Sequence, residues 1–425
     1  VIMALVFVLL LLMLLLGVPI AYGIGLAASF GLLTAAGVNL AVVPQRMFTM
    51  LDSFSLLAIP FFVLAGNLMD RGGISKKLIR FASCIVGHIR GGLGMVTILA
   101  CMLFGAISGS GSAASAAIGS LTIPAMKKKG YDGEFAGAIT AVSGPLGIII
   151  PPSVVMVIYA TTANVSVGQM FLAGYIPGIL LGLGMMISVY CIALKRHYPA
   201  ESRASIQEFL ISLKEAIWAL LMIVIIMGGI FGGFFTATEA ACVAVFYALL
   251  VGLFIYKELK PSDLGRIFED SAKTSAGIMF CVATTNILAW LMTNQQIPMK
   301  VAAVLGSSIN SKILMLIMVN VIFLILGTFL DSTPAIIMAV PILLPLVQQY
   351  GVDPVHFGII TTVNLAIGMS TPPVGITLFV SSSISETPLT TMVRFMLPIW
   401  AVMVGILLVI TYIPQISMLL PAIFG

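Results

Sequence analysis

The sequence predicts an all-α polytopic membrane protein with two inverted-topology repeats, each containing a re-entrant helical hairpin and a broken transmembrane helix. Of its 425 residues, 60% are hydrophobic and 8% are charged, whereas soluble domains carry about a quarter charged residues. Motifs of the first half recur in the second half, and glycine, serine and proline interrupt several apolar stretches near their centres. Broken helices within inverted repeats are typical of secondary transporters, which bind their substrates there.

The first repeat is predicted over residues 1–165. It opens with two scaffold spans that are interrupted at Gly17-Val18-Pro19-Ile20. The first apolar run has neither a basic n-region nor a small-residue cleavage pattern, so we expect a true span and not a signal peptide. Residues 75–89 are amphipathic, which suits an interfacial arm or hinge but also an ordinary surface helix.

Residues 94–126 are predicted to form the first hairpin. The stretch from Gly105 to Ser112 concentrates glycine and serine in the middle of an apolar segment, which indicates two half-helices joined by a polar tip. Irregular backbone at membrane depth is tolerated only where it is buried in protein or faces a cavity. We therefore expect the tip near the middle of the membrane.

Residues 132–163 are predicted to form the first broken helix, whose centre holds Gly144, Gly147 and the pair Pro151-Pro152. Proline removes a backbone donor and clashes with the carbonyl four residues earlier, so the pair unwinds the helix. Freed carbonyls and half-helix ends are groups that bind ions in transporters. Small residues also allow close helix packing in membranes, which is the alternative interpretation of each motif alone.

Residues 166–214 are predicted to form one connecting transmembrane helix and a cytoplasmic loop. A single crossing between the repeats turns the second one upside down. Basic residues gather in the first-half loops and are scarce in the corresponding second-half loops, and an excess of them marks the cytoplasmic side. We therefore interpret the net charge of +5 as a topology signal and expect both termini outside. The first-half cations are Lys76, Lys77, Arg80, Arg90, Lys127, Lys128 and Lys129.

The second repeat is predicted over residues 215–387. Its motifs keep a constant offset from those of the first, since Gly147 to Pro152 recurs as Gly368 to Pro373. The same register predicts, after the scaffold helices, an arm at residues 298–309, a hairpin at 313–347 and a broken helix at 354–384. A C-terminal transmembrane helix is predicted after the repeat, at residues 388–425.

These motifs, taken together, resemble those of the large membrane subunit of tripartite ATP-independent periplasmic (TRAP) transporters of the sialic acid and C4-dicarboxylate type. The resemblance covers essentially the full length of the chain. It rests on residues 17–21, 59–66, 105–115, 144–152, 235–241, 327–334 and 368–373.

The resemblance implies sodium-driven uptake of a small organic acid across the bacterial inner membrane by an elevator mechanism. It also implies a small four-helix membrane subunit and a periplasmic substrate-binding protein as partners, beside membrane lipid. No cofactor other than the coupling sodium ion is expected, and no nucleic acid. The alternative is a self-sufficient cation/carboxylate symporter that needs no binding protein.

Asp331 lies at the predicted tip of the second hairpin, where an ionisable side chain within the membrane is costly and is therefore a functional candidate. We predict that it binds a cation, and the resemblance identifies that cation as sodium; an N-cap of the following helix is the alternative, and the two roles are compatible. The predicted second sodium site is Gly327, Thr328, Asp331, Thr333, Gly368, Ser370 and Thr371. The predicted first site is Ser108, Ser110, Ser112, Ser143, Gly144 and Gly147.

An anionic substrate needs positive potential, and the sequence predicts no Lys or Arg at mid-depth. Half-helix N-termini at Ser112 and Thr333, together with the bound cations, are expected to supply it. The predicted substrate-binding residues are Ser112, Pro151, Pro152, Thr333, Pro372 and Pro373.

Two further interpretations concern carboxylates. Glu239 is predicted at a break between spans, where it caps a helix or contacts a partner subunit. An intramembrane aspartyl enzyme would need a second carboxylate close to Asp331, and Glu239 is predicted far from mid-depth. Neither a Ser-His pair nor a transition-metal site is indicated, so we expect a transporter and not an enzyme. A channel is disfavoured because interrupted inverted repeats indicate alternating access.

Overall fold

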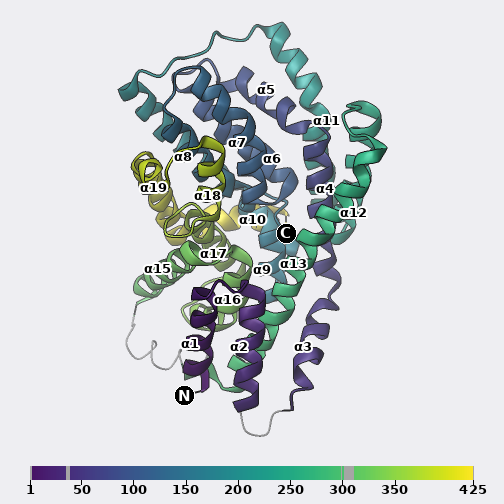
Figure 1. Cartoon of the computed structure of the whole chain (residues 1–425), viewed down its shortest axis with the longest axis vertical. Helices are drawn as coiled ribbons and strands as arrows, with labels where there is room; N and C mark the ends of the chain where they lie inside the picture. Colours follow the sequence, from purple (N-terminus) through teal and green to yellow (C-terminus); the bar gives the residue numbers. More distant parts are fainter. Residues whose placement is uncertain (1, 35–38, 298, 301–310, 425) are drawn as a thin grey trace.

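The computed structural model describes residues 2–34, 39–297, 299–300 and 311–424, and within these ranges the chain folds into helices without strands. The predicted all-α class is therefore confirmed (Figure 1). Eight helical segments of the described part are long and apolar enough to cross a membrane. They are Phe54–Arg71, Val167–Arg196, Ile206–Phe231, Ala237–Ile255, Pro261–Asn294, Lys312–Phe329, Ser332–Gln349 and Leu389–Tyr412.

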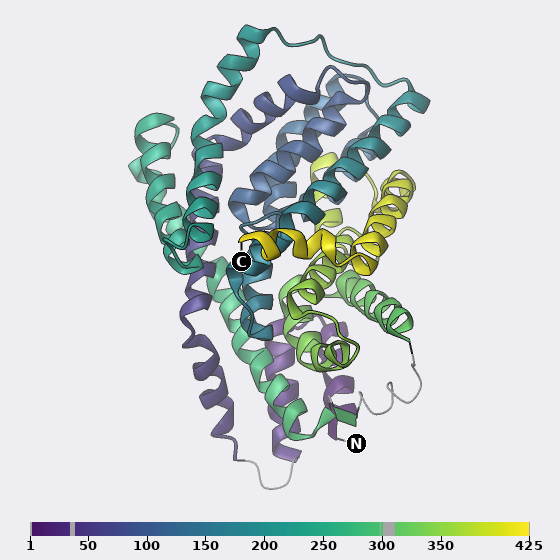
Figure 2. The ribbon, with the colours of Figure 1, turned by 180° about the vertical axis from the view of Figure 1, so that it is seen from behind.

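Helices from both halves of the chain line one side and the lower end of the molecule in the view of Figure 1, and we call this group the scaffold wall (Figures 1 and 2). It consists of α1 (Ile2–Leu15), α2 (Ile20–Thr34), α3 (Val42–Leu51), α4 (Ala58–Arg71), α11 (Ile206–Phe231), α12 (Ala237–Leu250) and α13 (Pro261–Asn294). The long helix α13 is its centre, because it contacts α2, α3 and α4. The pair α11–α12 coincides with predicted scaffold spans. Helices α1 and α2 lie where the first pair of spans is predicted, but with 14 and 15 residues they are shorter than the segments that could cross a membrane.

Both predicted hairpins are present as pairs of helices in contact. The first is α6 (Gly92–Ser108) with α7 (Gly111–Lys128), and the second is α15 (Lys312–Phe329) with α16 (Ser332–Gln349). In each hairpin, only two residues separate the two helices, so the tip is a tight turn.

Both predicted broken helices are also present. The first consists of α8 (Gly133–Ser143), a short 3₁₀ helix (Gly144–Ile148) and α9 (Val154–Ala163), and the second of α17 (Pro354–Gly368) and α18 (Ile376–Ser385). The halves of the chain interlock, because α9 packs on hairpin helix α16 while α18 packs on α7 and α8. Hairpins and broken helices therefore form one packed unit beside the scaffold wall.

The connecting segments agree with the predictions in part. α10 (Val167–Arg196) joins the two halves, and α5 (Ile74–Val86) occupies the first arm and packs on α6 and α11. The second arm, residues 298–309, falls almost wholly outside the described residues. The single C-terminal helix predicted over residues 388–425 is wrong, because the structure has α19 (Leu389–Tyr412) and α20 (Gln415–Phe424) there. Proline at position 414 ends α19, since the residue before a proline disfavours helical backbone.

Polar caps fix where several of these helices begin. The hydroxyl of Ser166 accepts from the backbone of Gln169 at the start of α10, and Ser205 forms a capping box with Glu208 at the start of α11. Asp353 caps α17. Such side chains satisfy backbone donors that have no partner within the helix, which matters most where water is scarce.

Glycine allows each hairpin to lie directly on its broken helix. A Cβ atom on Gly105 would lie 2.2 Å from the Cα of Gly147, and one on Gly368 would lie 2.5 Å from the Cα of Gly327. Real side chains do not tolerate such distances from backbone atoms. The same backbone-to-backbone contact thus occurs in both halves, between the end of the first hairpin helix and the break.

We expect Gly105→Ala to lower the thermal stability of the purified protein, because the added methyl group meets backbone that has no room to move. Overpacking of this kind typically costs about 1–3 kcal/mol. The matched control is Gly228→Ala in α11, where an added Cβ meets nothing within 4 Å. A thermal-unfolding assay in detergent should show a loss for the first variant and none for the second; equal midpoints would contradict the packing argument.

Candidate functional site

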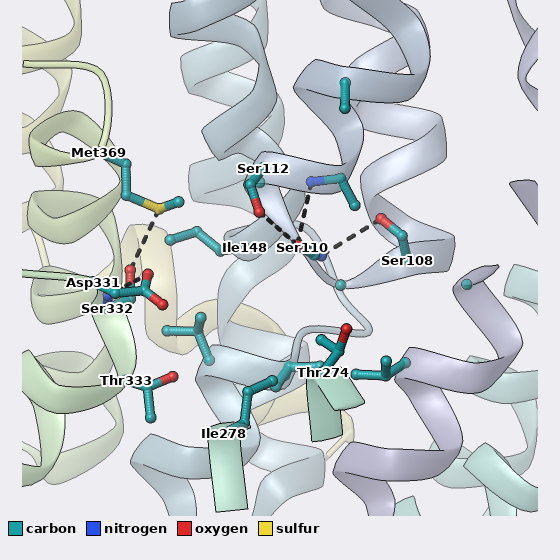
Figure 3. A pocket seen from close by; sticks show the side chains of 18 of the residues that line it. Ser108, Ser110, Ser112, Ile148, Thr274, Ile278, Asp331, Ser332, Thr333 and Met369 are labelled. Atoms are coloured by element: carbon teal, nitrogen blue, oxygen red, sulfur yellow. Dashed lines mark hydrogen bonds between the residues drawn. The ribbon is translucent and has the colours of Figure 1, made fainter. Parts of the chain in front are cut away.

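A cavity of about 440 Å³ lies between the two hairpin tips and the scaffold wall. Figure 3 shows residues of the first hairpin on one side and of the second on the other, with α13 residues Thr274 and Ile278 below them. Its polar lining consists of Asn67, Asp70, Ser108, Ser110, Ser112, Thr274, Asp331, Ser332 and Thr333. The structure therefore brings both predicted hairpin tips to one space.

The first hairpin tip is a cluster of serine hydroxyls. Gly109 has a φ of +63°, a left-handed conformation that ends α6 and suits glycine. The hydroxyl of Ser110 then caps α7 by accepting from the backbone N–H of Ala113 at 3.4 Å, and it lies 3.3 Å from that of Ser112. The Ser110 backbone N–H donates to Ser108 at 3.5 Å. The predicted residues Ser108, Ser110 and Ser112 thus form one polar group at the cavity.

The second hairpin tip carries a carboxylate in the corresponding place. Asp331 caps α16, and its Oδ1 accepts from the backbone N–H of Ser332 at 2.8 Å. The N-cap interpretation is confirmed by this bond. The side chain is nevertheless exposed to the cavity, which leaves carboxylate oxygen free for a cation. Thr333 lines the cavity beside it.

The two caps differ in charge although the tips correspond. Both α7 and α16 begin at the cavity, and a helix N-terminus carries a partial positive charge of roughly half a unit. Ser110 leaves that partial charge of α7 uncompensated, whereas Asp331, when ionised, outweighs that of α16. The first-hairpin side of the cavity therefore favours an anion, and the second-hairpin side favours a cation.

The remaining predicted sodium ligands stand behind the tips and do not line the cavity. They are Ser143, Gly144, Gly147, Gly327, Thr328, Gly368, Ser370 and Thr371. The glycines sit at close backbone contacts, and the hydroxyls donate to nearby helix carbonyls, as Ser143 does to Ile139 at 2.6 Å and Ser370 to Ile367 at 2.9 Å. A donating hydroxyl keeps lone pairs on its oxygen. Their binding of sodium stays a prediction.

The four prolines of the breaks also lie outside the lining of the cavity. Pro151-Pro152 and Pro372-Pro373 are both cis peptide bonds. Pro152 supports the first tip, since a Cβ on Gly109 would lie 3.1 Å from its carbonyl oxygen. At the second break, the backbone N–H of Val374 donates to the Thr328 carbonyl at 3.2 Å. The prolines shape the breaks, and their contact with substrate stays a prediction.

A threonine ties the two broken helices together. The hydroxyl of Thr377, at the start of α18, lies 2.8 Å from the carbonyl oxygen of Ala141 in α8 and 2.9 Å from that of Met369. Its side chain is fully buried. The bond to Ala141 joins residues of the two halves directly behind the site.

Several site residues were not predicted from the sequence. Asn67 and Asp70 come from α4 and Thr274 from α13, and all three line the cavity. Asn67 Nδ2 donates to Ser271 Oγ of α13 at 2.8 Å, so this bond also joins the two wall helices. Asn67 and Asp70 could have been noticed in the sequence, because they are two polar residues, three positions apart, near the end of an apolar segment.

A second cavity, of about 810 Å³, shares Thr274, Asp331 and Thr333 with the first. The sequence predicts no Lys or Arg at mid-depth, and the structure places Lys273 in the lining of this second cavity. Lys273 belongs to the charged first half of α13, which continues directly into the apolar part of the helix.

Glu239 lies away from both cavities and has a structural role. Its Oε2 accepts from the backbone N–H and the hydroxyl of Thr236, both at 2.8 Å, in a capping box that starts α12. The capping interpretation is confirmed by these bonds. In the part of the chain that the structure describes, no three His, Cys, Asp or Glu side chains gather as a metal site would require.

Comparison with known proteins identifies the family of this chain. The family described as "Tripartite ATP-independent periplasmic transporter, DctM component" matches residues 7–416. The chain belongs to this family. It is thus a large TRAP permease, as the resemblance of its motifs implies.

Similar permeases are named after several different substrates. It is 44% identical to the isethionate TRAP transporter permease protein DctMQ of Oleidesulfovibrio alaskensis, over 95% of this chain and 64% of that protein. It is 42% identical to the C4-dicarboxylate large permease DctM of Pseudomonas aeruginosa, over 95% and 94% of the two chains. It is 40% identical to the sialic acid large permease SiaM of Vibrio cholerae, over 96% of each.

A solved structure supports the fold of the TRAP permease. The Alcanivorax borkumensis YdaH transporter, described as having an unusual topology, superposes with a TM-score of 0.62 over 87% of this chain and 86% of its own. Its sequence identity is 14%. The likeness is therefore one of fold alone.

We expect Thr377→Val to loosen the contact between the broken helices of the permease. The substitution removes the hydroxyl that binds Ala141, and a hydrogen bond of this kind typically contributes about 1 kcal/mol. The control is Thr161→Val in α9, whose hydroxyl binds only the carbonyl of Val157 in its own helix. Thermal unfolding should begin earlier for the first variant than for the second, and the reverse order would refute the proposed tie.

Proposed function

We propose that this permease carries out sodium-coupled secondary active uptake of a small organic acid across the bacterial inner membrane. C4-dicarboxylates, sialic acid and isethionate are the candidate substrates, because relatives carry these names. All are small organic anions with a carboxylate or a sulfonate group. Their shared chemistry agrees with a cavity that has one anion-favouring and one cation-favouring side.

The observation that carries the proposal is the unlike capping of the two hairpin tips. The substrate anion binds at the N-terminus of α7 beside Ser112, with Thr333 facing it across the cavity. Sodium binds at Asp331. In this assignment, further sodium ligands come from the breaks behind the tips, as predicted from the sequence.

Electrostatics then explains why uptake needs sodium. Without the cation, the carboxylate of Asp331 repels an anion in the same cavity. Two like unit charges about 8 Å apart repel by about 2 kcal/mol at an effective dielectric constant of about 20. That energy corresponds to about a thirty-fold loss of substrate affinity, which a bound sodium ion removes.

The proposed mechanism is an elevator movement of the hairpins and broken helices against the scaffold wall. Support comes from the interlocked packing of the hairpin unit and from an arm, α5, that reaches from α6 to α11. In this proposal both termini are periplasmic, a small four-helix subunit accompanies the chain, and a periplasmic binding protein delivers the substrate. The family description supports the tripartite arrangement.

Replacing the carboxylate of Asp331 tests the cation site. Asparagine caps helices about as well as aspartate, so we expect Asp331→Asn to fold normally but to need at least ten-fold more sodium for half-maximal uptake into proteoliposomes. Asp331→Ala loses the cap as well, which typically costs about 1 kcal/mol of stability. The matched control is Asp353→Asn, which alters the cap of α17 away from the cavity. Unchanged sodium dependence in Asp331→Asn would contradict the assignment of Asp331 as a sodium ligand.

The need for partners is a separate test. Uptake of labelled succinate or sialic acid should require the small subunit and the binding protein together with this chain. Robust sodium-driven uptake by the chain alone would instead identify a self-sufficient carboxylate symporter.

A further inference from the structure

The second cavity holds a basic residue that no part of the proposed mechanism has used. We propose that Lys273, on α13, captures the anionic group of the substrate at this cavity and hands it to the hairpin tips. This inference rests on the proposed function and adds a specific binding residue to it.

The charged residues that line the two cavities favour this role for Lys273. Among the described residues that line either cavity, the acidic and basic side chains are Asp70, Asp331 and Lys273. An organic anion that approaches the hairpin tips therefore meets two carboxylates and a single compensating cation. Neither Arg71, which lies 4.0 Å from Asp270, nor Arg46, which lies over the ring of Trp290, lines either cavity.

The ammonium group of Lys273 is available to a ligand, because its present partner holds it only weakly. Lys273 Nζ donates to Glu269 Oε1 at 2.6 Å, four residues earlier on the same helix, and the two side chains are 70% and 62% exposed. An exposed pair of this kind shifts an equilibrium by only about two-fold. A substrate carboxylate or sulfonate therefore displaces Glu269 at little cost, and the lysine is free to bind it.

Lys273 also lies next to residues that line both cavities. Thr274, the next residue, lines both cavities, and so do Asp331 and Thr333 at the second hairpin. An anion held by Lys273 thus lies in a cavity that shares lining residues with the predicted substrate site. Because α13 belongs to the scaffold wall and not to the hairpins, this contact acts on capture of the substrate and is released before the substrate is carried. We therefore expect an effect on KM and little effect on Vmax.

The test is sodium-driven uptake by the complete transporter in proteoliposomes, measured with succinate, N-acetylneuraminate and isethionate. For whichever of these the wild type transports, Lys273→Gln should raise KM about two- to five-fold, the loss expected for an ion pair made by a lysine this exposed, with Vmax unchanged. Lys273→Arg should restore KM. Glu269→Gln should leave KM unchanged or lower it, because it frees the lysine.

The matched control is Lys260→Gln, which removes a lysine just before α13 that lines neither cavity. An unchanged KM in Lys273→Gln, or an equal rise in Lys260→Gln, would overturn the inference and leave the proposed function intact. A fall in Vmax that arginine does not rescue would show a structural role instead, and would also overturn it. If the wild type transports none of the three anions, the proposed function fails and this inference fails with it.

Discussion

At Gly105 and Gly147, and again at Gly327 and Gly368, the backbone of a hairpin lies directly against the backbone of a broken helix. The rest of the structure depends on this contact. Irregular backbone inside a membrane must be shielded from lipid, and the absence of side chains at these glycines lets each tip and each break shield the other. The same contact brings both tips to a single cavity, so the packing constraint also creates the site.

With both tips at one cavity, the N-cap residues of α7 and α16 determine the charge on its two sides. Serine and aspartate both satisfy the free backbone donors at the start of a helix, and for the fold they are nearly interchangeable. For a bound ion they are opposites, because one leaves the helix N-terminus positive and the other makes the tip negative. Ser110 and Asp331 occupy corresponding places in the two hairpins. In the proposed function, this one difference between the two hairpin tips gives them opposite binding preferences.

Sequence reasoning predicted the elements well and the walls of the site poorly. Hairpins and breaks carry glycine, serine and proline, whose effects on backbone are local, so Ser110, Asp331 and the double prolines could be located without a structure. Asn67 and Thr274 could not, because their role depends on how α4 and α13 pack against the hairpins. Lys273 was missed for the same reason, since a lysine in a charged helix segment has no local feature that marks a cavity. The C-terminal break at Pro414 did have a local signal, the proline itself, which the long apolar run obscured.

The most direct test of unlike capping is the fluorescence of Trp400, whose Nε1 donates to the hydroxyl of the predicted sodium ligand Ser370 at 3.0 Å. In a protein with Trp218→Phe and Trp290→Phe, sodium would be titrated with and without succinate, or with another anion that the wild type transports. The account predicts that Asp331→Asn weakens sodium binding in both conditions. Because a carboxylate also binds sodium, we expect that Ser110→Asp does not weaken sodium binding without the anion, but that it abolishes the tightening that the anion causes. Equal effects of the two substitutions, or the opposite pattern, would contradict it.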